Sequence, residues 1–339
     1  MDTSRFRSAR TTHRESLQDV IPVPTPYQLV IDTTNACNFK CEFCPTSDRE
    51  LLKSVGRPIG YMPYELFCKI IDDCKEFDRP IRRIDFGKDG EPLLNKRFPD
   101  MVRYAKQSGV TQMVGVATNA SFLTHEMADS LVDAGLDLIK ISVEAVSNEG
   151  YAKIAKVKFD YEQLIERVTY LFNNRKNTKV YAKIIDYGLP QADKDKFFDD
   201  FNDISDYITI DTVTGWSVVS AKDWTLGTNP STYLDLPSFN MKEVCPYPFY
   251  TVAINFDGRV SICCVDWSLA TLVGDLRTES LKELWEGERM YEFRKMHLTG
   301  NRHQNKACGD CHTIKGLPDN IDAYADQILA KLTAQRAAR

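Results

Sequence analysis

Three cysteines within eight residues are the part of this 339-residue sequence best equipped for chemistry. Cys37, Cys41 and Cys44 follow a short apolar stretch, residues 27–31. Three thiolates on one loop can hold three corners of a cubane iron–sulfur cluster and leave the fourth iron open to a small molecule. A structural zinc site closes its tetrahedron with four protein ligands, whereas a catalytic metal keeps one position open. The triplet therefore predicts a catalytic cluster, and the alternatives are chance cysteines or a zinc knuckle with a distant fourth ligand.

A second group of cysteines gathers towards the end of the chain. The Asp257-Gly258 pair lies between alternating apolar residues and predicts a tight β-hairpin. We expect the second strand of this hairpin to carry two adjacent cysteines, which then point to opposite faces, so that only one of them binds a metal. The members of the group are Cys245, Cys263, Cys264, Cys308 and Cys311.

Strand-like and helix-like patterns alternate before this second group. Such alternation predicts a parallel sheet with helical crossovers, whose reactive loops lie at the carboxyl ends of the strands. The Cys37 loop directly follows the first strand and so lies at that edge. The predicted strands are 27–32, 82–87, 111–117, 136–143, 180–185 and 207–213, and the predicted helices are 63–77, 99–108, 124–134, 161–174 and 194–206.

Polar residues follow the next three strands at the same edge. Residues 87–92 read Gly-Lys-Asp-Gly-Glu-Pro, and the pairs Thr118, Asn119 and Ser142, Glu144 end the third and fourth strands. Taken singly, each also fits a turn or a helix cap. Their placement on successive strand ends favours one shared binding site.

The C-x3-C-x2-C spacing, with Phe43 directly before the third cysteine, resembles the radical S-adenosylmethionine (SAM) superfamily. The resemblance implies an α/β fold, a partial (β/α)6 TIM-like barrel. It also implies that the open iron chelates the amino and carboxylate groups of SAM. One electron then cleaves SAM, and the 5′-deoxyadenosyl radical takes a hydrogen atom from an unactivated C–H bond. Phe43 would lie beside the adenine.

The same resemblance assigns expected SAM contacts at the strand ends. Gly90 and Glu91 match the end of the family's Gly-Gly-Glu motif, which binds the SAM amino group, although Asp89 stands where the first glycine usually is. The polar positions expected around the ribose and carboxylate of SAM are Thr118, Asn119, Ser142 and Glu144.

The second cysteine group resembles the SPASM/twitch extension of some radical SAM enzymes, as do residues 274–285. Because the cysteines end at Cys311, the resemblance implies one auxiliary [4Fe–4S] cluster, the second of two in the chain, and a zinc ribbon is the alternative. Cys264 is then a spare thiol, the true ligand in place of Cys263, or a hydrogen-atom donor to a substrate radical. The expected auxiliary ligands are Cys245, Cys263, Cys308 and Cys311.

Composition narrows the class of protein. A net charge of −5 and a pI near 5.7 argue against a nucleic-acid binder. No apolar run approaches the roughly 20 residues needed to cross a bilayer, and the basic N-terminus lacks the apolar core of a signal peptide. We therefore expect a cytoplasmic enzyme without membrane contact. The expected parts are an arm or lid (1–26), the barrel (27–215), a connector (216–244), the auxiliary-cluster extension (245–315) and a C-terminal helix (316–339) that packs on the surface or in a homodimer.

The resemblance favours an oxidoreductase or epimerase acting on a sugar or aminocyclitol, reduced by a partner such as flavodoxin or ferredoxin. A peptide maturase is the first alternative, although only 26 residues precede the first strand and leave no room for a peptide-binding domain. A non-catalytic electron carrier is the second. Late strand ends supply the candidate substrate contacts Lys183, Asp186, Asp211 and Trp216.

Overall fold

The computed structural model describes residues 5–7, 15–213, 222, 224, 226, 242–309, 311 and 313–338. Within them, nine strands form one sheet in the order β6-β5-β4-β3-β2-β1-β7-β8-β9. Strands β1 to β6 pair in parallel, β7 pairs in parallel with β1, and β8 and β9 follow antiparallel. The strands are β1 (Gln28–Ile31), β2 (Arg83–Phe86), β3 (Val114–Thr118), β4 (Leu138–Val143), β5 (Lys179–Asp186), β6 (Tyr207–Thr212), β7 (Thr251–Ile254), β8 (Arg259–Ser261) and β9 (Leu272–Asp275).

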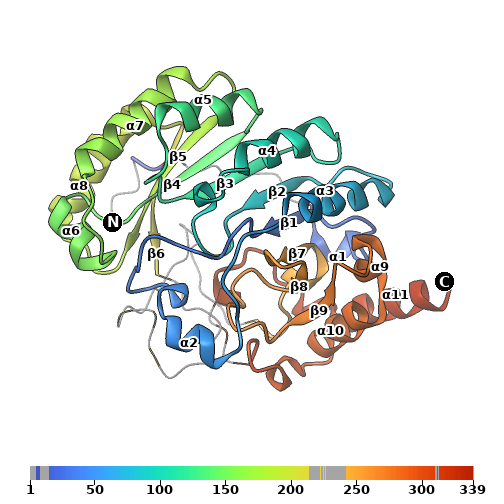
Figure 1. Ribbon diagram of the computed structural model, residues 1–339. Helices are drawn as coiled ribbons and strands as arrows, with labels where there is room; N and C mark the ends of the chain where they lie inside the picture. The colour runs from blue at the N-terminus through green and yellow to red at the C-terminus, as the bar shows by residue number, and fades with distance from the viewer. Residues whose placement is uncertain are drawn as a thin grey trace.

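Helices cover the outer face of the curved parallel part, and the C-terminal helices gather beside β7 to β9 (Figure 1). None of the helices in the described part of the chain has the length and apolarity that a bilayer crossing requires. The α-helices are α1 (Leu17–Val20), α2 (Arg49–Ser54), α3 (Tyr64–Asp73), α4 (Phe98–Gln107), α5 (His125–Asp133), α6 (Asn148–Ile154), α7 (Tyr161–Asn174), α8 (Gln191–Phe201), α9 (Leu281–Glu286), α10 (Glu288–Leu298) and α11 (Ala325–Ala337).

The sequence predicted the six parallel strands and the five long helices between them, with ends that differ by a few residues. Helix α7 has the predicted bounds, and the Asp160 side chain caps it by accepting from Gln163 N at 3.1 Å. The short elements α2, α6 and β9 were not predicted. In the extension, helices α9 and α10 meet at Gly287.

The core of the barrel is apolar and lies between the strands and the helices. Leu29 and Ile31 of β1 and Ile139 and Ile141 of β4 are fully buried under the helices. Because β1 to β6 are parallel, the loops that follow them lie along one edge of the sheet. The loops after β1, β2, β3 and β4 carry the predicted functional residues to that edge.

The C-terminal extension continues the barrel sheet through β7, which pairs with β1. The predicted Asp257-Gly258 hairpin is present between β7 and β8, and Gly258 has φ +88°. One prediction was wrong here. Strand β8 ends at Ser261, after a register shift, so Cys263 and Cys264 lie in the turn that follows and not on the strand.

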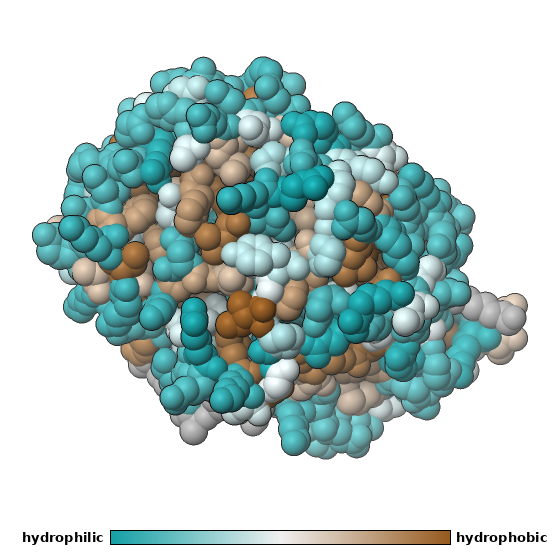
Figure 2. All heavy atoms as spheres, viewed as in Figure 1, coloured by the Kyte–Doolittle hydropathy of each residue, from teal (hydrophilic) through white to brown (hydrophobic). Residues whose placement is uncertain are grey.

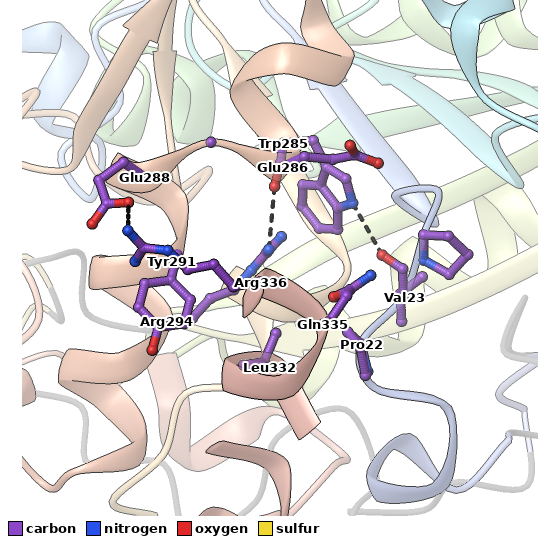
Figure 3. Close-up of a pocket in the computed structure, with 12 residues that line it drawn as sticks. Pro22, Val23, Trp285, Glu286, Glu288, Tyr291, Arg294, Leu332, Gln335 and Arg336 are labelled. Carbon is purple, nitrogen blue, oxygen red and sulfur yellow. Dashed lines mark hydrogen bonds and ion pairs between the residues drawn. The ribbon is translucent and has the colours of Figure 1, made fainter. Parts of the chain in front are cut away.

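The sequence suggested a flexible N-terminal arm or a lid on the barrel, and the described residues of this arm pack in two places. Arg7 pairs with Ile208 of β6 on the barrel through backbone hydrogen bonds of 3.0 and 2.9 Å, whereas residues 17–23 pack against the extension. Leu17 and Ile21 share a small core with Ile328 and Leu332 of α11. Figure 3 shows the junction where residues 22–24, the start of α10 and helix α11 surround a small pocket. There Trp285 Nε1 donates to the backbone oxygen of Val23 at 3.0 Å. Residues 17–23 and the C-terminal helix therefore pack together on the extension.

Candidate active site

One cavity of about 350 Å³ lies at the carboxyl ends of the barrel strands. It brings together the cysteine triplet and most of the residues predicted to act near it. On the face drawn in Figure 2, hydrophobic side chains gather near the middle, around the junction of barrel and extension, while hydrophilic ones cover the periphery. The predicted residues that line this SAM-site cavity are Cys37, Cys41, Phe43, Cys44, Gly90, Glu91, Thr118, Asn119, Ser142, Glu144, Lys183 and Asp211.

Backbone hydrogen bonds tie the cysteine loop to the end of helix α6. Lys40 N donates to the backbone oxygen of Ala155 at 2.9 Å, and Glu42 N donates to that of Ile154 at 3.0 Å. Burial raises the pKa of the Cys37 thiol to about 12 and that of Cys44 to about 11. Metal binding must therefore displace protons from these thiols.

Gly90 lies where the loop after β2 meets the cysteine loop. Its φ is +75°, and a Cβ built on it would lie 2.6 Å from the backbone oxygens of both Thr34 and Ala36. Such a contact is far inside van der Waals distance, so only glycine fits without moving one of the two loops. The next residue, Glu91, donates its backbone N–H to Ala36 O at 2.8 Å. The Gly-Glu pair therefore fixes the spacing between the two loops.

The Glu91 carboxylate ties the motif loops to one another. It accepts hydrogen bonds from Thr118 Oγ1 and Asn119 N, both at 2.7 Å, and from Leu93 N at 2.9 Å. Burial raises the pKa of Glu91 to about 7, although these hydrogen bonds oppose the shift. Asn119 Nδ2 in turn donates to Asn38 Oδ1 at 3.1 Å. The predicted SAM contacts from three strand ends are thus one connected group.

The far side of the cavity carries both signs of charge. Burial raises the pKa of Glu144 to about 7. Lys183 Nζ lies 3.8 Å from Asp211 Oδ2, and Asp211 Oδ1 accepts from Thr209 Oγ1 at 3.0 Å. Phe43 stacks on Tyr187 with ring centroids 6.3 Å apart.

Two predicted substrate residues are not part of this group. Asp186 does not line the cavity. Its carboxylate binds Lys194 Nζ at 2.5 Å and accepts from the backbone N–H groups of Gly188 and Leu189. It therefore closes the turn after β5. Trp216 lies outside the described residues.

A buried ionic group beside the cavity was not predicted. Arg57 forms an ion pair with Asp89, lies 3.6 Å from Asp32 Oδ2 and donates to the backbone oxygen of Trp267 at 2.6 Å. Lys88 Nζ binds Asp89 Oδ2 at 2.5 Å and approaches Asp266 O at 3.4 Å.

These contacts connect the loop after β2 to the extension. Burial and the neighbouring Asp89 raise the pKa of Asp32 to about 8. Burial acts on Asp89 as well, but Arg57 and Lys88 hold its pKa below the usual range. Asp89, which stands where the family motif has its first glycine, is thus held by ion pairs with Arg57 and Lys88.

A second cavity, of about 30 Å³, lies in the extension. The four predicted auxiliary ligands all line it, together with apolar residues such as Phe293 and Ile314. Burial raises the pKa of Cys308 to about 12 and lowers that of His297 to about 4. Val265 lines both this auxiliary cavity and the SAM-site cavity, so a single residue forms part of the wall between them. The four cysteines are Cys245, Cys263, Cys308 and Cys311.

Cys263 and its neighbour Cys264 differ in what they face. Cys263 lines the auxiliary cavity, whereas Cys264 does not. The two thiols are within hydrogen-bonding distance of each other, and Cys264 is close enough to Lys88 and Asp89 to feel their charges. Lys88 and Asp89 line the SAM-site cavity, but Cys264 itself lines neither cavity.

The donor sets fit iron–sulfur clusters. Soft thiols are the usual ligands of such clusters, and here three line a roomy polar cavity while four line a tight apolar one. Within the described ranges, no three His, Cys, Asp or Glu side chains are grouped to hold a single metal ion. The two cysteine sets are therefore recognised by the cavities that they line, and not by a metal-binding geometry among the side chains.

Comparison with known families agrees with this geometry. Residues 31–203 match the model of the radical SAM superfamily, and residues 245–312 match that of the SPASM iron–sulfur cluster-binding domain. The chain belongs to the radical SAM superfamily and carries a SPASM domain. Its fold is the partial barrel with an iron–sulfur extension, and its cofactors are [4Fe–4S] clusters and SAM.

Relatives with known activities differ in substrate. A tungsten-containing aldehyde ferredoxin oxidoreductase cofactor-modifying protein from Pyrococcus furiosus is 27% identical, over 84% of this chain and 86% of its own. A SAM-dependent 2-deoxy-scyllo-inosamine dehydrogenase from Niallia circulans is 21% identical, over 84% and 92%.

Solved structures share the fold at low identity. BtrN in complex with AdoMet and 2-DOIA has a TM-score of 0.54 at 18% identity and covers 84% of this chain and 92% of that chain. SuiB from Streptococcus suis bound to SAM has a TM-score of 0.63 at 14% identity, over 92% and 76%. The chain is therefore a radical SAM enzyme whose substrate has to be argued from its own site.

Proposed function

We propose that this enzyme dehydrogenates a small polyhydroxylated molecule, such as a sugar or an aminocyclitol. One observation carries the proposal. A single cavity holds the cysteine triplet, the SAM-motif residues and the Lys183–Asp211 pair, and it shares Val265 with the auxiliary cavity. A substrate bound there would lie between the site of hydrogen abstraction and an electron acceptor, which is the arrangement that an alcohol oxidation requires.

The proposed roles follow the two cavities. Phe43 would stack beside the adenine, and Gly90 and Glu91 would place the SAM amino group. Thr118, Asn119, Ser142 and Glu144 would contact its ribose or carboxylate. The proposed ligands are Cys37, Cys41 and Cys44 for the SAM-binding cluster and Cys245, Cys263, Cys308 and Cys311 for the auxiliary cluster.

Lys183 and Asp211 suit a substrate with several hydroxyl or amino groups. Their charged ends are 3.8 Å apart and only partly buried, so each keeps capacity to bind a ligand. The Asp211 carboxylate can accept from a substrate hydroxyl or ammonium, and Lys183 can donate to a second oxygen. Together they would orient one carbinol C–H bond towards the SAM side of the cavity.

The bound cofactors would supply a 5′-deoxyadenosyl radical and an acceptor for one electron. The protein would hold the substrate hydroxyl, remove its proton and exclude water while the C–O bond becomes C=O. A one-electron donor such as flavodoxin or ferredoxin is the proposed reducing partner.

Epimerisation is the alternative outcome and depends on Cys264. Cys264 lies near Lys88 and Asp89 of the SAM-site cavity, and its thiol would have to reach that cavity to return a hydrogen atom to the opposite face of the substrate radical. A Cys264→Ala variant that still cleaves SAM and abstracts hydrogen but releases no epimer would favour this outcome. Unchanged turnover in that variant would exclude the donor role and leave dehydrogenation.

The test uses anaerobically reconstituted protein, a chemical reductant, SAM and substrates deuterated at each carbon. The expected result is deuterium in 5′-deoxyadenosine from one carbinol position of a polyol, with a matching carbonyl product. Deuterium transfer from a peptide, or from a large cofactor of the kind that the P. furiosus relative modifies, would overturn the substrate assignment.

Two aspartates provide matched variants. Asp211→Asn should abolish substrate turnover while SAM cleavage persists, because Asp211 lines the cavity. Asp186→Asn should leave substrate turnover near that of the unaltered protein, because Asp186 lies outside it. Equal effects of the two changes would contradict the proposed substrate position.

A further inference from the structure

The auxiliary cavity contains a buried cation. Among the described residues that line it, Arg302 is the only lysine or arginine. The residue is 8% exposed and lies at the start of a short 3-10 helix, six positions before Cys308. The walls around it are largely apolar, with Ile262, Phe293 and Ile314 among them. A charge in such surroundings acts strongly on any other charge in the cavity.

The guanidinium group is fixed beside a proposed cluster ligand. Arg302 Nη1 donates to the backbone oxygen of Cys308 and, at 3.2 Å, to that of Gly309. The backbone N–H groups of Cys308 and Gly309 both donate to Asn305 O, at 3.0 and 2.9 Å. The cation is therefore anchored to the same turn that presents the Cys308 thiol to the cavity.

The other ionisable groups of the cavity are occupied differently. The Asp266 carboxylate accepts from Ser268 Oγ, Thr271 Oγ1 and Thr271 N, each at 2.7 Å, and from Ala270 N at 3.2 Å. Its charge is thus spread over donors of its own loop. His297 Nδ1 accepts from Cys245 N at 3.4 Å, a contact that requires this ring nitrogen to be unprotonated. Arg302 remains as the group that brings positive charge to the thiols.

We propose that Arg302 tunes the auxiliary cluster to accept an electron from the substrate. A cluster bound by four thiolates is negatively charged and gains one more negative charge when it is reduced. A fixed cation beside it stabilises the reduced form more than the oxidised form and raises the reduction potential. Arg302 is in this sense a positioning residue, since it acts through the cluster without touching the substrate.

The catalytic consequence rests on the proposed dehydrogenation. After hydrogen abstraction from the carbinol carbon, the substrate radical gives one electron to the auxiliary cluster and its hydroxyl proton to a base. The C–O single bond thereby becomes a C=O double bond. The electron would then leave the site to an oxidised one-electron carrier protein. Arg302 would favour the first of these electron transfers.

The test is a redox titration monitored by electron paramagnetic resonance, on full-length reconstituted protein without substrate. The Cys37→Ala, Cys41→Ala, Cys44→Ala background isolates the auxiliary signal. In this background, Arg302→Gln should make electron uptake about tenfold less favourable. The reduction potential of the auxiliary cluster should then fall by about 59 mV, the value for a one-electron couple. Arg302→Lys, which keeps the charge, should retain most of the potential. Arg277→Gln, which removes an exposed charge outside this lining, is the matched control and should leave the reduction potential unchanged.

Equal potentials for Arg302→Gln and the unaltered side chain, at equal iron content, would overturn the proposal. If Arg302→Gln binds no cluster, its potential cannot be measured, and the Arg302→Lys variant then distinguishes the role of the charge from that of the hydrogen bonds. Recovery of the cluster and its potential in the lysine variant supports a role for the charge. Loss of the cluster in both variants means that the two hydrogen bonds to the Cys308 turn matter and the charge does not. Because no substrate is present, failure of the proposed dehydrogenation would leave these results unaffected, and the reverse also holds.

Discussion

The two cysteine cavities of this enzyme differ in size, polarity and number of thiols. The cavity at the barrel edge measures about 350 Å³ and combines three thiols with carboxylates, one side-chain amide and two lysines. The cavity in the extension measures about 30 Å³ and combines four thiols with mainly apolar walls. The first arrangement leaves room and polar partners for a small molecule at an open iron. The second suits a fully ligated cluster that exchanges only electrons.

The number of thiols alone does not determine what each site can bind, because the elements that carry them also differ. Residues 32–44, 87–91 and 118–120 come from three strand ends, and they converge because parallel strands share one edge. The extension cavity is lined by the segment before the β7–β8 hairpin, the turn after it, helix α10 and the residues that follow α10, with no such shared edge. Substrate chemistry is therefore expected on the barrel side, and electron handling on the extension side.

Removing the triplet should have the largest effect. In a Cys37→Ala, Cys41→Ala, Cys44→Ala variant, production of 5′-deoxyadenosine should fall to background because no open iron remains to bind SAM. Iron should drop from about eight to about four atoms per chain. Chromatographic quantification of 5′-deoxyadenosine and an iron assay test this. Continued SAM cleavage would show that the triplet is not the SAM site.

Removing the auxiliary pair should separate the two functions. A Cys308→Ala, Cys311→Ala variant should lose a similar amount of iron yet still cleave SAM, because the barrel cavity is intact. Carbonyl product should disappear, since the electron acceptor is gone. Mass spectrometry of substrate and product measures both outcomes. Product formation at the unaltered rate would remove the extension from the oxidation.

Gly90 tests the packing of the SAM-binding loops. In Gly90→Ala the new methyl group meets the oxygens of Thr34 and Ala36, so we expect SAM affinity to fall about tenfold or more. Gly109→Ala is a close control, because Gly109 has φ +70° and no atom within 4 Å of its Cβ position. It should be destabilised by about 1 kcal/mol through backbone strain alone and bind SAM normally. Calorimetric titration with SAM compares the two, and equal affinities would contradict the packing argument.

Arg57 tests the contact between barrel and extension. In Arg57→Met the buried Asp89 loses one of its two cations and Trp267 O loses its donor. We expect the free energy of unfolding to fall by about 3–5 kcal/mol, the usual effect of removing one partner from a buried ion pair. Denaturant unfolding measures it, and Arg97→Met is the control at an exposed ion pair, expected to change little. A small change at Arg57 would show that the network does not join the two parts.

The sequence predicted those features that depend on local pattern. Cysteine spacing indicated the triplet, and strand–helix alternation placed Gly90, Thr118 and Glu144 at one edge. The contacts of Arg57 with Trp267 and of Lys88 with Asp266 join residues far apart in the chain, so no local pattern could indicate them.

The remaining differences between the sequence expectations and the structure have similar physical origins. Asp186 resembled a strand-end ligand, but Lys194, one helical turn and a loop away, takes its carboxylate. Cys263 and Cys264 were expected on β8, but a register shift ends that strand at Ser261. No sequence pattern indicated that Arg302 is buried, because arginine side chains are usually exposed.

We propose that the barrel cavity holds a cluster with one exchangeable iron position and that the extension cavity does not. The most direct measurement is the electron paramagnetic resonance spectrum of reduced protein, with and without SAM, in the two cysteine variants. The account predicts that SAM shifts the signal of the Cys308→Ala, Cys311→Ala variant and leaves that of the Cys37→Ala, Cys41→Ala, Cys44→Ala variant unchanged. A SAM-dependent shift in the second variant, or none in the first, would contradict it.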